Sequence, residues 1–287
     1  MYTKEFMIPE GSKVRLSDFD PGYTASFYSK EEAEIKLEED RKQLMKLQEL
    51  LYAHNKFGVL LIFQALDAAG KDSTIKHVMK GINPQGCQVH SFKVPSTEEL
   101  DHDYMWRYSK ALPERGNIGI FNRSYYEEVL VVRVHKELLV RQNLPDSVIT
   151  DSIWKQRYRH IREYEKYLHE NGFLILKFFL HVSKEEQKQR FLKRLENPEK
   201  NWKFSMSDIR ERRHWDAYMD AYQDTLEHTS TEAAPWFVIP ADKKWFMRMA
   251  VADIIGEAIS GLPLKYPKSL LEDTGELELA KQELSAG

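Results

Sequence analysis

The sequence predicts an α/β fold in which a parallel β-sheet is flanked by helices. Short apolar runs alternate with longer amphipathic stretches along the 287 residues, as in the βαβ units of a doubly wound sheet. No Pro/Gly/Ser-rich linker divides the chain, and hydrophobic residues make up 42% of it, which suffices for one sizeable core. We therefore expect one domain over residues 29–265, between an N-terminal arm (1–28) and a C-terminal tail (266–287).

The first half of the chain begins with turn-forming residues and continues with strands and helices in alternation. Residues 1–28 are expected to be irregular and to lie over the domain. Leucines at helical spacing then predict a helix over 30–54. Continuous apolar runs predict buried strands at 58–63, 87–92 and 118–121, and the segments that follow them predict helices at 73–82, at 97–112 and from 124 to 135.

The second half repeats this alternation. Residues 151–170 form a long amphipathic pattern and predict a helix. "FLILKFFLHV" (173–182) is the most apolar strand candidate in the chain, and "WFVIP" (236–240) is the last strand, followed by a helix through Ile259. The end of the tail, 270–287, predicts either a charged helix or a frayed terminus.

Composition excludes several classes of protein. Lys plus Arg is 42 and Asp plus Glu is 45, a net charge of 42 − 45 = −3, which disfavours a general nucleic-acid binder. Cys87 is the one cysteine, so neither an internal disulfide nor a cysteine-based zinc site is expected. No apolar run approaches the ~20 residues of a membrane span, and the N-terminal residues "MYTKEFMIPEGSKVRL" contain no apolar signal core. We expect a cytoplasmic protein with no membrane partner.

Residues 62–76, "IFQALDAAGKDSTIK", resemble a phosphate-binding loop between a strand and a helix. In the standard pattern, G-x-x-x-x-G-K-[ST], Gly70 and Lys71 take the last Gly-Lys pair, but Ala65 replaces the first glycine and Asp72 the Ser/Thr. Backbone N–H groups and a helix N-terminus can hold phosphate, with Lys71 as the mobile cation. The predicted phosphate-binding residues are Ala68, Ala69, Gly70, Lys71, Asp72, Ser73 and Thr74. An ordinary turn with a surface lysine is the alternative.

Two acids, Asp67 and Asp72, stand in or beside this loop, where they repel a phosphate unless a cation lies between. Mg²⁺ favours ligation by carboxylate, phosphate and water together. We therefore expect Mg²⁺ (or Mn²⁺) as the cofactor, with Asp67 and Asp72 as its ligands. The alternative for Asp72 is a helix N-cap.

A second polar cluster follows the strand at 118–121. Asn122, Arg123 and Ser124 stand where an open α/β sheet binds ligands, and they reach the loop if the two strands are neighbours. Arg123 can bind a phosphate with two hydrogen bonds. Either Glu127 or Glu128 can point back to the metal or the acceptor, unless both only stabilise the N-terminus of the next helix.

Residues 184–205 are rich in Lys and Arg and are interrupted near Pro198, which predicts a helix–loop–helix. Arg190 and Arg194 are four residues apart and share a helix face. A basic lid of this kind would exclude water and stabilise charge over a phosphate site. A solvated charged helix is the alternative.

Several long blocks together resemble the polyphosphate kinase 2 family: "FQALDAAGKDSTIKHVMKGINPQG", "IGIFNRSYYEEVLVVRVH" and "NWKFS" followed by "ERRHWDAYMDAY". The resemblance covers about residues 15–265. It implies a phosphate-loop, thymidylate-kinase-like fold with a helical lid, Mg²⁺ dependence and a homo-oligomer. It implies catalytic roles for Asp67, Lys71, Asn122, Arg123 and Glu127, and lid roles for Arg190, Arg194 and Lys203. Many members have Asp where Asn122 stands, and Asn there, with Ala65, is typical of the branch that accepts mono- and diphosphates.

The function so predicted is reversible phosphoryl transfer between inorganic polyphosphate and AMP, ADP or their guanine counterparts. Because the protein as a whole is acidic, a local basic groove must then hold the polyanion. Lys93, Arg107 and Arg133 are further candidates for this groove, and the alternative is that they are plain surface charges. One alternative is an ATP-dependent nucleoside monophosphate kinase. Another is a regulator that binds polyphosphate or nucleotide without turnover.

Overall fold

The computed structural model describes residues 3–27, 29–268 and 276–286. Within these residues, six strands form one sheet in the order β1-β6-β5-β2-β4-β3. The strands are β1 (Met7–Ile8), β2 (Gly58–Gln64), β3 (Cys87–Ser91), β4 (Ile118–Asn122), β5 (Phe173–His181) and β6 (Trp236–Pro240). β2 to β6 run parallel, and β1 pairs antiparallel with β6. The predicted α/β class with a parallel sheet is confirmed.

The helices connect these strands. The α-helices are α1 (Thr3–Phe6), α2 (Lys30–His54), α3 (Lys71–Val78), α4 (Thr97–Asp101), α5 (Trp106–Ser109), α6 (Val131–Val134), α7 (Ile153–Glu170), α8 (Lys184–Glu196), α9 (Met206–Arg212), α10 (Trp215–Thr229), α11 (Lys244–Ser260) and α12 (Glu276–Ala286). The 3₁₀ helices are η1 (Leu16–Asp18), η2 (Pro84–Gly86), η3 (Tyr125–Glu128), η4 (Lys136–Gln142) and η5 (Asn201–Lys203).

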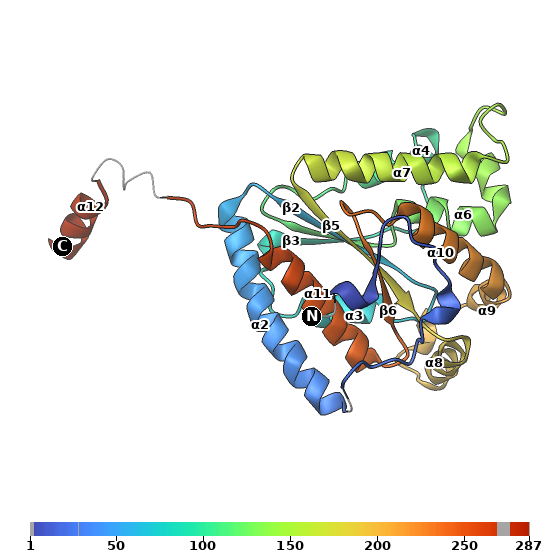
Figure 1. The fold of residues 1–287 in the computed structure, drawn as a ribbon, viewed down its shortest axis with the longest axis horizontal. Coiled ribbons are helices and arrows are strands. Elements are labelled where there is room, and N and C mark those ends of the chain that lie inside the picture. Colours follow the sequence, from blue (N-terminus) through green and yellow to red (C-terminus); the bar gives the residue numbers. More distant parts are fainter. Residues whose placement is uncertain (1–2, 28, 269–275, 287) are drawn as a thin grey trace.

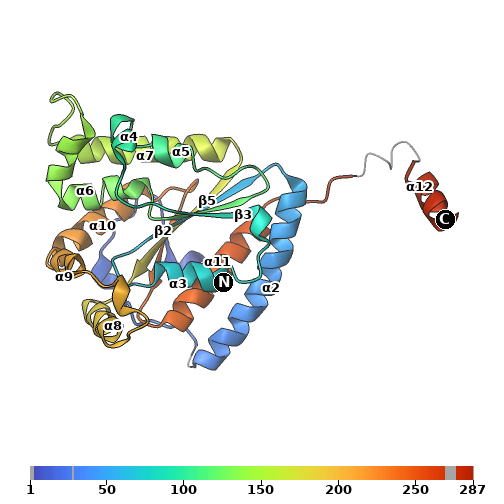
Figure 2. The same cartoon turned by 180° about the vertical axis from the view of Figure 1, so that it is seen from behind.

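Different helices cover the two faces of the sheet (Figures 1 and 2). Along β2, Val59, Leu61 and Phe63 point to a core shared with α2, α3 and α11. Leu60 and Ile62 point to the opposite core, which α7 and α10 close. This alternation follows from the two-residue period of a strand, and it explains why β2 is apolar throughout: both of its faces are buried.

The strand order places two polar segments side by side. β2 pairs with β4 on one side and with β5 on the other. In the β2–β4 register, Phe63 lies opposite Asn122. The carboxyl ends of these parallel strands therefore meet at one edge of the sheet, which is where open α/β sheets bind ligands. The two strands are neighbours, so Asn122, Arg123 and Ser124 emerge beside the predicted phosphate-binding loop.

The N-terminal segment is more regular than the irregular arm that the sequence predicts. It contains α1, η1 and β1, which extends the sheet beyond β6. The backbone N–H of Leu16 donates to the side chain of Gln223 in α10 at 3.2 Å, so the segment does lie over the domain as expected. A strand of two residues leaves no periodic pattern, which is why sequence reasoning could not find β1.

The single helix predicted over 97–112 is wrong, because the segment contains α4 and α5 with a break between them. Asp103 makes this break. Its carboxylate accepts the N–H of Met105 and its carbonyl accepts the N–H of Trp106, both at 2.9 Å, in place of helical hydrogen bonds.

The helix predicted from 124 to 135 is also wrong in its first half. Tyr125–Glu128 form the 3₁₀ helix η3, and α6 begins only at Val131. The hydroxyl of Ser124 accepts the N–H of Tyr126 at 3.2 Å and so caps η3. Leu130 departs from helical angles, with φ −110° and ψ −80°, and separates η3 from α6. The polar cluster after β4 is therefore a tight turn and not the start of a long helix.

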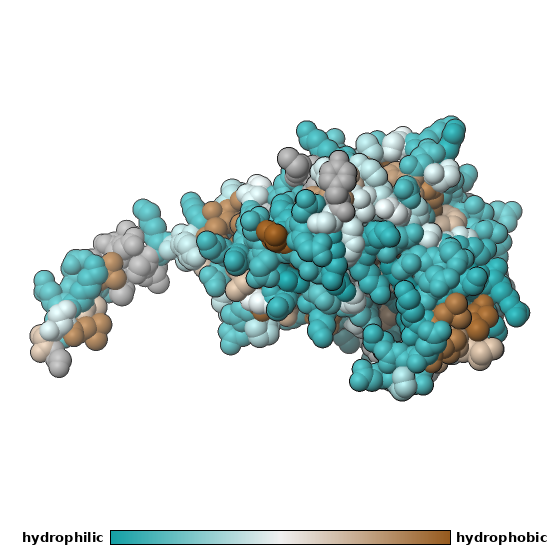
Figure 3. Space-filling view, turned by 90° about the horizontal axis from the view of Figure 1, so that it is seen from below, coloured by the Kyte–Doolittle hydropathy of each residue, from teal (hydrophilic) through white to brown (hydrophobic). Residues whose placement is uncertain are grey.

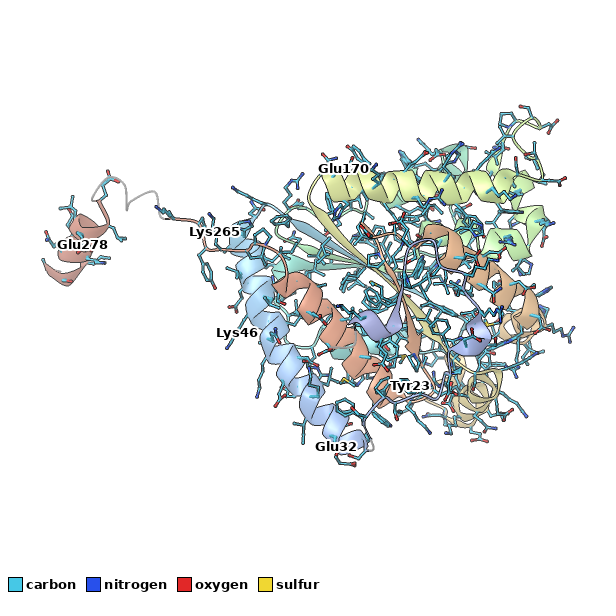
Figure 4. All side chains as sticks on the ribbon, viewed as in Figure 1. Tyr23, Glu32, Lys46, Glu170, Lys265 and Glu278 are labelled. Carbon is cyan, nitrogen blue, oxygen red and sulfur yellow. The ribbon has the colours of Figure 1, made fainter. Side chains whose placement is uncertain are left out.

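The break predicted near Pro198 separates α8 from η5, and α9 follows. Of the tail, 276–286 form α12, which lies apart from the body in Figure 1, so the helix alternative is confirmed there. Residues 269–275 and 287 lie outside the described residues. In Figure 4, Lys265 lies at the end of α2 opposite Glu32, and its carbonyl is 3.0 Å from Nδ1 of His54.

The described residues contain no helix that combines the length and the apolarity needed to cross a membrane. Most of the face seen in Figure 3 is hydrophilic; a compact hydrophobic patch lies near its lower right edge, and smaller hydrophobic spots are scattered elsewhere.

Candidate active site

The β2–α3 loop, residues 65–70, turns sharply from the sheet into a helix. Ala68 and Gly70 have φ values of +61° and +109°, in the left-handed region that favours glycine. A Cβ on Gly70 would also meet the terminal methyl of Met247 at 3.3 Å. The N–H of Thr74 closes the first helical turn onto the Gly70 carbonyl at 2.9 Å. The N–H groups before it have no partner within α3, so the turn can accept an anion.

Lys71 begins α3 and is buried beneath this loop. Its Nζ donates a hydrogen bond of 2.7 Å to the carbonyl of Ala65, across the loop. Burial, followed by the positive charge of Arg123, lowers the pKa of Lys71 to about 8. A surface lysine, the alternative from the sequence, does not have this environment. An anion bound in the loop would favour the charged form of Lys71.

Arg123 joins the two sequence motifs, because it follows β4 directly beside the end of β2. Its Nη2 donates to Oδ1 of Asp67 and its Nη1 to Oε2 of Glu127, each at 2.9 Å. Glu127 contributes most to raising the pKa of the Arg123 guanidinium above its ordinary value, and Asp67 adds to the shift. The guanidinium is thus a permanent cation between one acid of the loop and one acid of the second motif.

Asn122 and Asp72 make a second bridge between the motifs. Nδ2 of Asn122 donates to Oδ1 of Asp72 at 2.7 Å. Asp72 is exposed in the first turn of α3, where a negative charge is favourable. The N-cap of α3 is Gly70, so the alternative in which Asp72 is that N-cap is wrong.

Of the two glutamates, only Glu127 faces the loop. Nε2 of Gln64 donates to Oε1 of Glu127 at 3.0 Å, in addition to the contact from Arg123. Glu128 is buried on the other side of η3, where Nη1 of Arg157 donates to its Oε2 at 3.0 Å. The two neighbours therefore have different environments: Glu127 lines both cavities described below, whereas the buried Glu128 lines only the second of them and is bound by Arg157.

The remaining side chains of the loop and of the first turn of α3 are held by the protein. Nη2 of Arg248 donates to Oγ of Ser73 at 2.8 Å. Oγ1 of Thr74 donates to the Gly70 carbonyl at 3.0 Å. These contacts join α11 to α3 and fix the turn on which the N–H groups lie.

Arg190 was predicted to be a mobile cation of the lid above the phosphate, but the structure places it elsewhere. It is buried, and its Nη1 donates to the carbonyl of Ala69 at 2.6 Å, with Ala68 at 3.2 Å. Its Nη2 donates to the carbonyl of Ala241 at 2.6 Å, and its Nε to Glu186 at 2.8 Å. Arg190 thus fastens the backbone of the β2–α3 loop to the segment after β6.

Arg194 and Lys203 lie in the segment predicted to be a lid, 184–205, which contains α8 and η5; α9 extends it, and the name lid is kept below for residues 184–212, although closure over a substrate stays a prediction. Nη1 of Arg194 is 3.6 Å from Oδ2 of Asp208 in α9, so it links the two lid helices. Lys203 falls in η5, and its side chain lies outside the described part of the structure.

Two cavities meet at Arg123 and Glu127, which line both. The first has about 310 Å³, lies between the loop and the lid, and is called the donor cavity after the role proposed for it below. The second has about 540 Å³, lies beside the start of η3, and is called the acceptor cavity for the same reason. Residues that line the donor cavity include Ala65, Asp67, Gln187, Asp208, Glu211, Arg212 and Tyr222. Those of the acceptor cavity include Phe92, Lys93, Leu100, Arg107, Tyr108, Leu138 and Arg141.

Of the three further basic residues predicted as candidates for the polyanion groove, two line a cavity and one does not. Lys93 and Arg107 line the acceptor cavity, and Nη2 of Arg107 donates to the Lys93 carbonyl at 3.0 Å. Arg133 lines neither cavity, since its Nη2 donates to Asp224 at 2.5 Å between α6 and α10.

Residues 27–265 match the family model described as Polyphosphate kinase 2. The chain belongs to the polyphosphate kinase 2 family. It is 51% identical over 283 residues to an ADP-polyphosphate phosphotransferase from Rhodopseudomonas palustris, covering 98% of each chain. It is 47% identical over 266 residues to an AMP/ADP-polyphosphate phosphotransferase from Meiothermus ruber, covering 92% of this chain and 96% of that one.

A solved polyphosphate kinase 2 has the same fold. The crystal structure of Polyphosphate Kinase 2 from Arthrobacter aurescens TC1 superposes with a TM-score of 0.88 and 39% sequence identity, covering 97% of this chain and 96% of that one. The family resemblance drawn from the sequence motifs is confirmed.

In this polyphosphate kinase 2 chain, the carboxylates assigned to a metal are Asp67 and Asp72. Within the described ranges, no group of three or more His, Cys, Asp or Glu side chains is placed to hold a metal ion. Mg²⁺ commonly takes one or two carboxylates and completes its shell with substrate phosphates and water. Two carboxylates beside an anion-binding turn fit that manner of binding, and Mg²⁺ ligation by them stays a proposal.

Sequence reasoning missed several residues of the polyphosphate kinase 2 site. Gln64 is a fully buried polar residue at the end of an apolar strand, and that position was a signal that could have been used. Gln187 donates to the Asp67 carbonyl at 3.0 Å, and Tyr222 and Asp208 line the donor cavity. These three come from the lid and α10, and their sequence context gives no sign that they approach the loop.

Proposed function

We propose that the protein transfers the terminal phosphoryl group of inorganic polyphosphate to AMP and ADP, or to their guanine counterparts, and runs the reverse reaction. The observation that carries this proposal is the position of Arg123 and Glu127 at the junction of two cavities. Phosphoryl transfer needs two anionic substrates to meet in line at one cationic point. The names of the relatives support polyphosphate as donor and adenine nucleotides as acceptors.

The donor end of polyphosphate is assigned to the β2–α3 loop, as in a phosphate-loop fold of the thymidylate-kinase type. The left-handed turn at Gly70, the buried Lys71 and the N-terminus of α3 support this assignment. The lid covers the same cavity with Arg212, whose Nη1 donates to Oε1 of Gln187 at 2.7 Å. Closure of this side would keep water away from the transferred group.

The acceptor nucleotide is assigned to the acceptor cavity. Its walls combine the rings of Phe92 and Tyr108 with the cations Lys93 and Arg141. A nucleobase can stack on or pack against the aromatic and aliphatic walls, while the nucleotide phosphate turns toward Arg123. The volume of about 540 Å³ lies within the range of small-ligand sites.

The reaction needs no separate general base. A phosphate oxygen of AMP or ADP is already ionised near pH 7, since the second pKa of a phosphate monoester is about 6. This oxygen attacks the terminal phosphorus of polyphosphate, one anhydride P–O bond forms, and the P–O bond to the next phosphate of the chain breaks. The shortened polyphosphate leaves with the bonding electrons, so the atoms and charges balance.

The protein's part in this step is positioning and neutralisation of charge. Lys71 holds the donor phosphate, and Arg123 neutralises charge on the acceptor while Glu127 and Asp67 fix its guanidinium. Asp67 and Asp72 are the residues that would hold Mg²⁺, which supplies further charge neutralisation at the phosphate oxygens when bound. Reversibility is expected because the bond broken and the bond made are both phosphoanhydrides.

A donor–acceptor matrix tests the proposal. Purified protein is incubated with Mg²⁺ and AMP, ADP, GMP or GDP, with either polyphosphate or ATP as donor, and the nucleotides are separated by chromatography. ADP from AMP and ATP from ADP, formed with polyphosphate alone, support it. Phosphorylation of AMP with ATP alone would mean a nucleoside monophosphate kinase, and no turnover would mean a binding regulator. A Lys71→Ala preparation controls for contaminating kinases and is expected to be inactive.

A further inference from the structure

A buried ion pair lies in the core behind the site. Lys177 of β5 and Glu165 of α7 are both fully buried, and Nζ of Lys177 donates to Oε2 of Glu165 at 2.6 Å. Nζ also donates to the Thr229 carbonyl at 2.7 Å and approaches the hydroxyl of Tyr126 at 2.9 Å. Neither Lys177 nor Glu165 lines the donor or the acceptor cavity.

This pair holds the segment that carries Arg123 and Glu127. The hydroxyls of Tyr125 and Tyr126 both donate to Oε1 of Glu165 at 2.8 Å. These tyrosines begin η3, directly after Ser124 and before Glu127. A single carboxylate oxygen therefore fixes two consecutive residues between the two charged groups of the site.

The opposite side of η3 is fixed in the same way. Glu128 accepts hydrogen bonds from Nη1 of Arg157 at 3.0 Å and from Nε2 of Gln142 at 2.6 Å. Nη1 of Arg157 also donates to the Glu128 carbonyl at 3.0 Å. η3 is thus held between two buried, charge-assisted networks, and Glu127 is its acid that lines both cavities.

The segment needs this support because its entry is strained. Arg123 has φ +66°, a left-handed conformation that costs a non-glycine residue about 1 kcal/mol or more. Only a short 3₁₀ turn follows it, and that turn alone cannot enforce the conformation. The buried ion pair itself costs free energy, because a cation and an anion are both removed from water. Well-packed apolar residues in the same place often stabilise a protein equally well. Stability of the core is therefore a weak reason for this pair.

We infer that Glu165 and Lys177 are positioning residues for phosphoryl transfer: through Tyr125 and Tyr126 they hold Arg123 and Glu127 at the junction of the two cavities. The inference rests on the proposed function. Loss of this network should therefore lower kcat, because misplacement of Arg123 affects the transition state, in which charge and alignment matter most. Donor binding at the β2–α3 loop, on the neighbouring strand, should be little affected.

The test removes the two hydroxyls and keeps the rings, the ion pair and the packing. The double variant Tyr125→Phe/Tyr126→Phe should lower kcat about 10-fold or more, with KM for polyphosphate within about 2-fold of the wild type. Tyr164→Phe is the matched control, since its ring lies 5.9 Å from that of Tyr125, but its hydroxyl contacts Ser109 and not Glu165. This control should keep its kcat. The single variants are measured as well, in case the double variant does not fold.

A second measurement separates positioning from a loss of folded protein. In an Arg123→Lys background, which lacks the two-armed contact to Asp67 and Glu127, the tyrosine changes should cost less than about 3-fold further in kcat. Melting temperatures of all variants give the folded fraction. Unchanged kcat in the tyrosine variants, or a full additional loss in the Arg123→Lys background, would overturn the inference. Turnover of the wild type tests the proposed function separately.

Discussion

Arg123 lies 2.9 Å from the carboxylate of Asp67, so this acid of the phosphate-binding loop has a cationic partner within the protein. The loop still presents a carboxylate beside the proposed site of the polyphosphate end, so the polyanion needs a further cation there. If Mg²⁺ lies between Asp67 and the phosphates, chelation of the metal should weaken polyphosphate binding in the wild type. Asp67→Asn should bind polyphosphate about equally with and without Mg²⁺, but transfer it at least ~100-fold more slowly.

Titration calorimetry of both proteins, with Mg²⁺ and with chelator, measures this difference. Asp146→Asn, an exposed change in a loop outside both cavities, is the control and should behave as the wild type. Metal-independent binding by the wild type, or full activity of Asp67→Asn, would refute a metal role for this carboxylate.

The pKa of Lys71, lowered to about 8 by burial, predicts a falling limb in the pH profile. Below pH 8 the free enzyme carries the charge, and above it the charge is lost, so kcat/KM for polyphosphate should fall as pH rises through about 8. The value of kcat should persist to higher pH, because bound phosphate favours charged Lys71. Between pH 8 and 10.5 the unfolded chain binds more protons at Lys71 than the folded chain, so through this group the free energy of unfolding rises with pH, and a falling rate there is not explained by loss of stability through Lys71.

Rates measured from pH 6 to 10 check this limb. Burial lowers the pKa of Lys177 to about 8 as well, so the assignment needs a variant. Lys71→Arg keeps its charge across this range, and whatever activity it retains should lack the limb. If the limb near pH 8 remains in Lys71→Arg, Lys71 is not its origin.

Arg190 and Arg194 are expected to differ, although they share a helix face. Arg190→Ala removes donors from the carbonyls of Ala69 and Ala241 in a buried place, which should cost about 3 kcal/mol of unfolding free energy and most of the activity. Arg194→Ala breaks a partly exposed contact with Asp208 and should cost less than about 1 kcal/mol.

Thermal or urea unfolding and initial rates, measured on the same preparations, distinguish the two roles. Equal, small stability changes in both variants would show that Arg190 does not fasten the loop. A lid role for Arg194 requires that its loss lowers the rate while the melting temperature stays nearly unchanged.

Filling the acceptor cavity should affect one substrate only. Leu138 lines that cavity, and a Leu138→Trp side chain would occupy space assigned to the nucleobase. KM for AMP and ADP should rise about 10-fold or more, with KM for polyphosphate nearly unchanged. Val140→Trp is the control on the same 3₁₀ helix, since Val140 is exposed and lines a different hollow. If the KM for polyphosphate rises instead, this cavity holds the donor, and the assignments of donor and acceptor to the two cavities are reversed.

The sequence predicted much of the sheet because its signals are local. β2 and β5 are continuous apolar runs, and the capping box at Ser29 and Glu32 marks the beginning of α2, where a helix was predicted. The motifs also placed Asp67, Lys71 and Arg123 near one another, once β2 and β4 were taken as neighbours. The 3₁₀ turn at Tyr125–Glu128 could not be foreseen, since its conformation depends on Glu165, about 40 residues away.

Arg190 is a second residue whose surroundings could not be predicted from local sequence. A basic residue on an amphipathic helix is usually a solvated charge, and nothing local indicates that its guanidinium lies under a loop 121 residues earlier in the chain. Its partners are backbone carbonyls, which leave no trace in side-chain patterns. The type of residue was correctly singled out, but its surroundings were set by packing between distant segments.

Two supports of the β2–α3 loop and of the first turn of α3 are made late in synthesis. Arg190 and Arg248, which contact Ala69 and Ser73, follow them by 121 and 175 residues. At synthesis rates of about 5–20 residues per second, Ser73 is added to the chain about 9–35 s before Arg248. During that interval the nascent chain carries the recognisable phosphate-binding motif without the scaffold that shapes it. We therefore expect catalytic competence only after translation has passed β6, and a chain interrupted before that point should not turn over nucleotides.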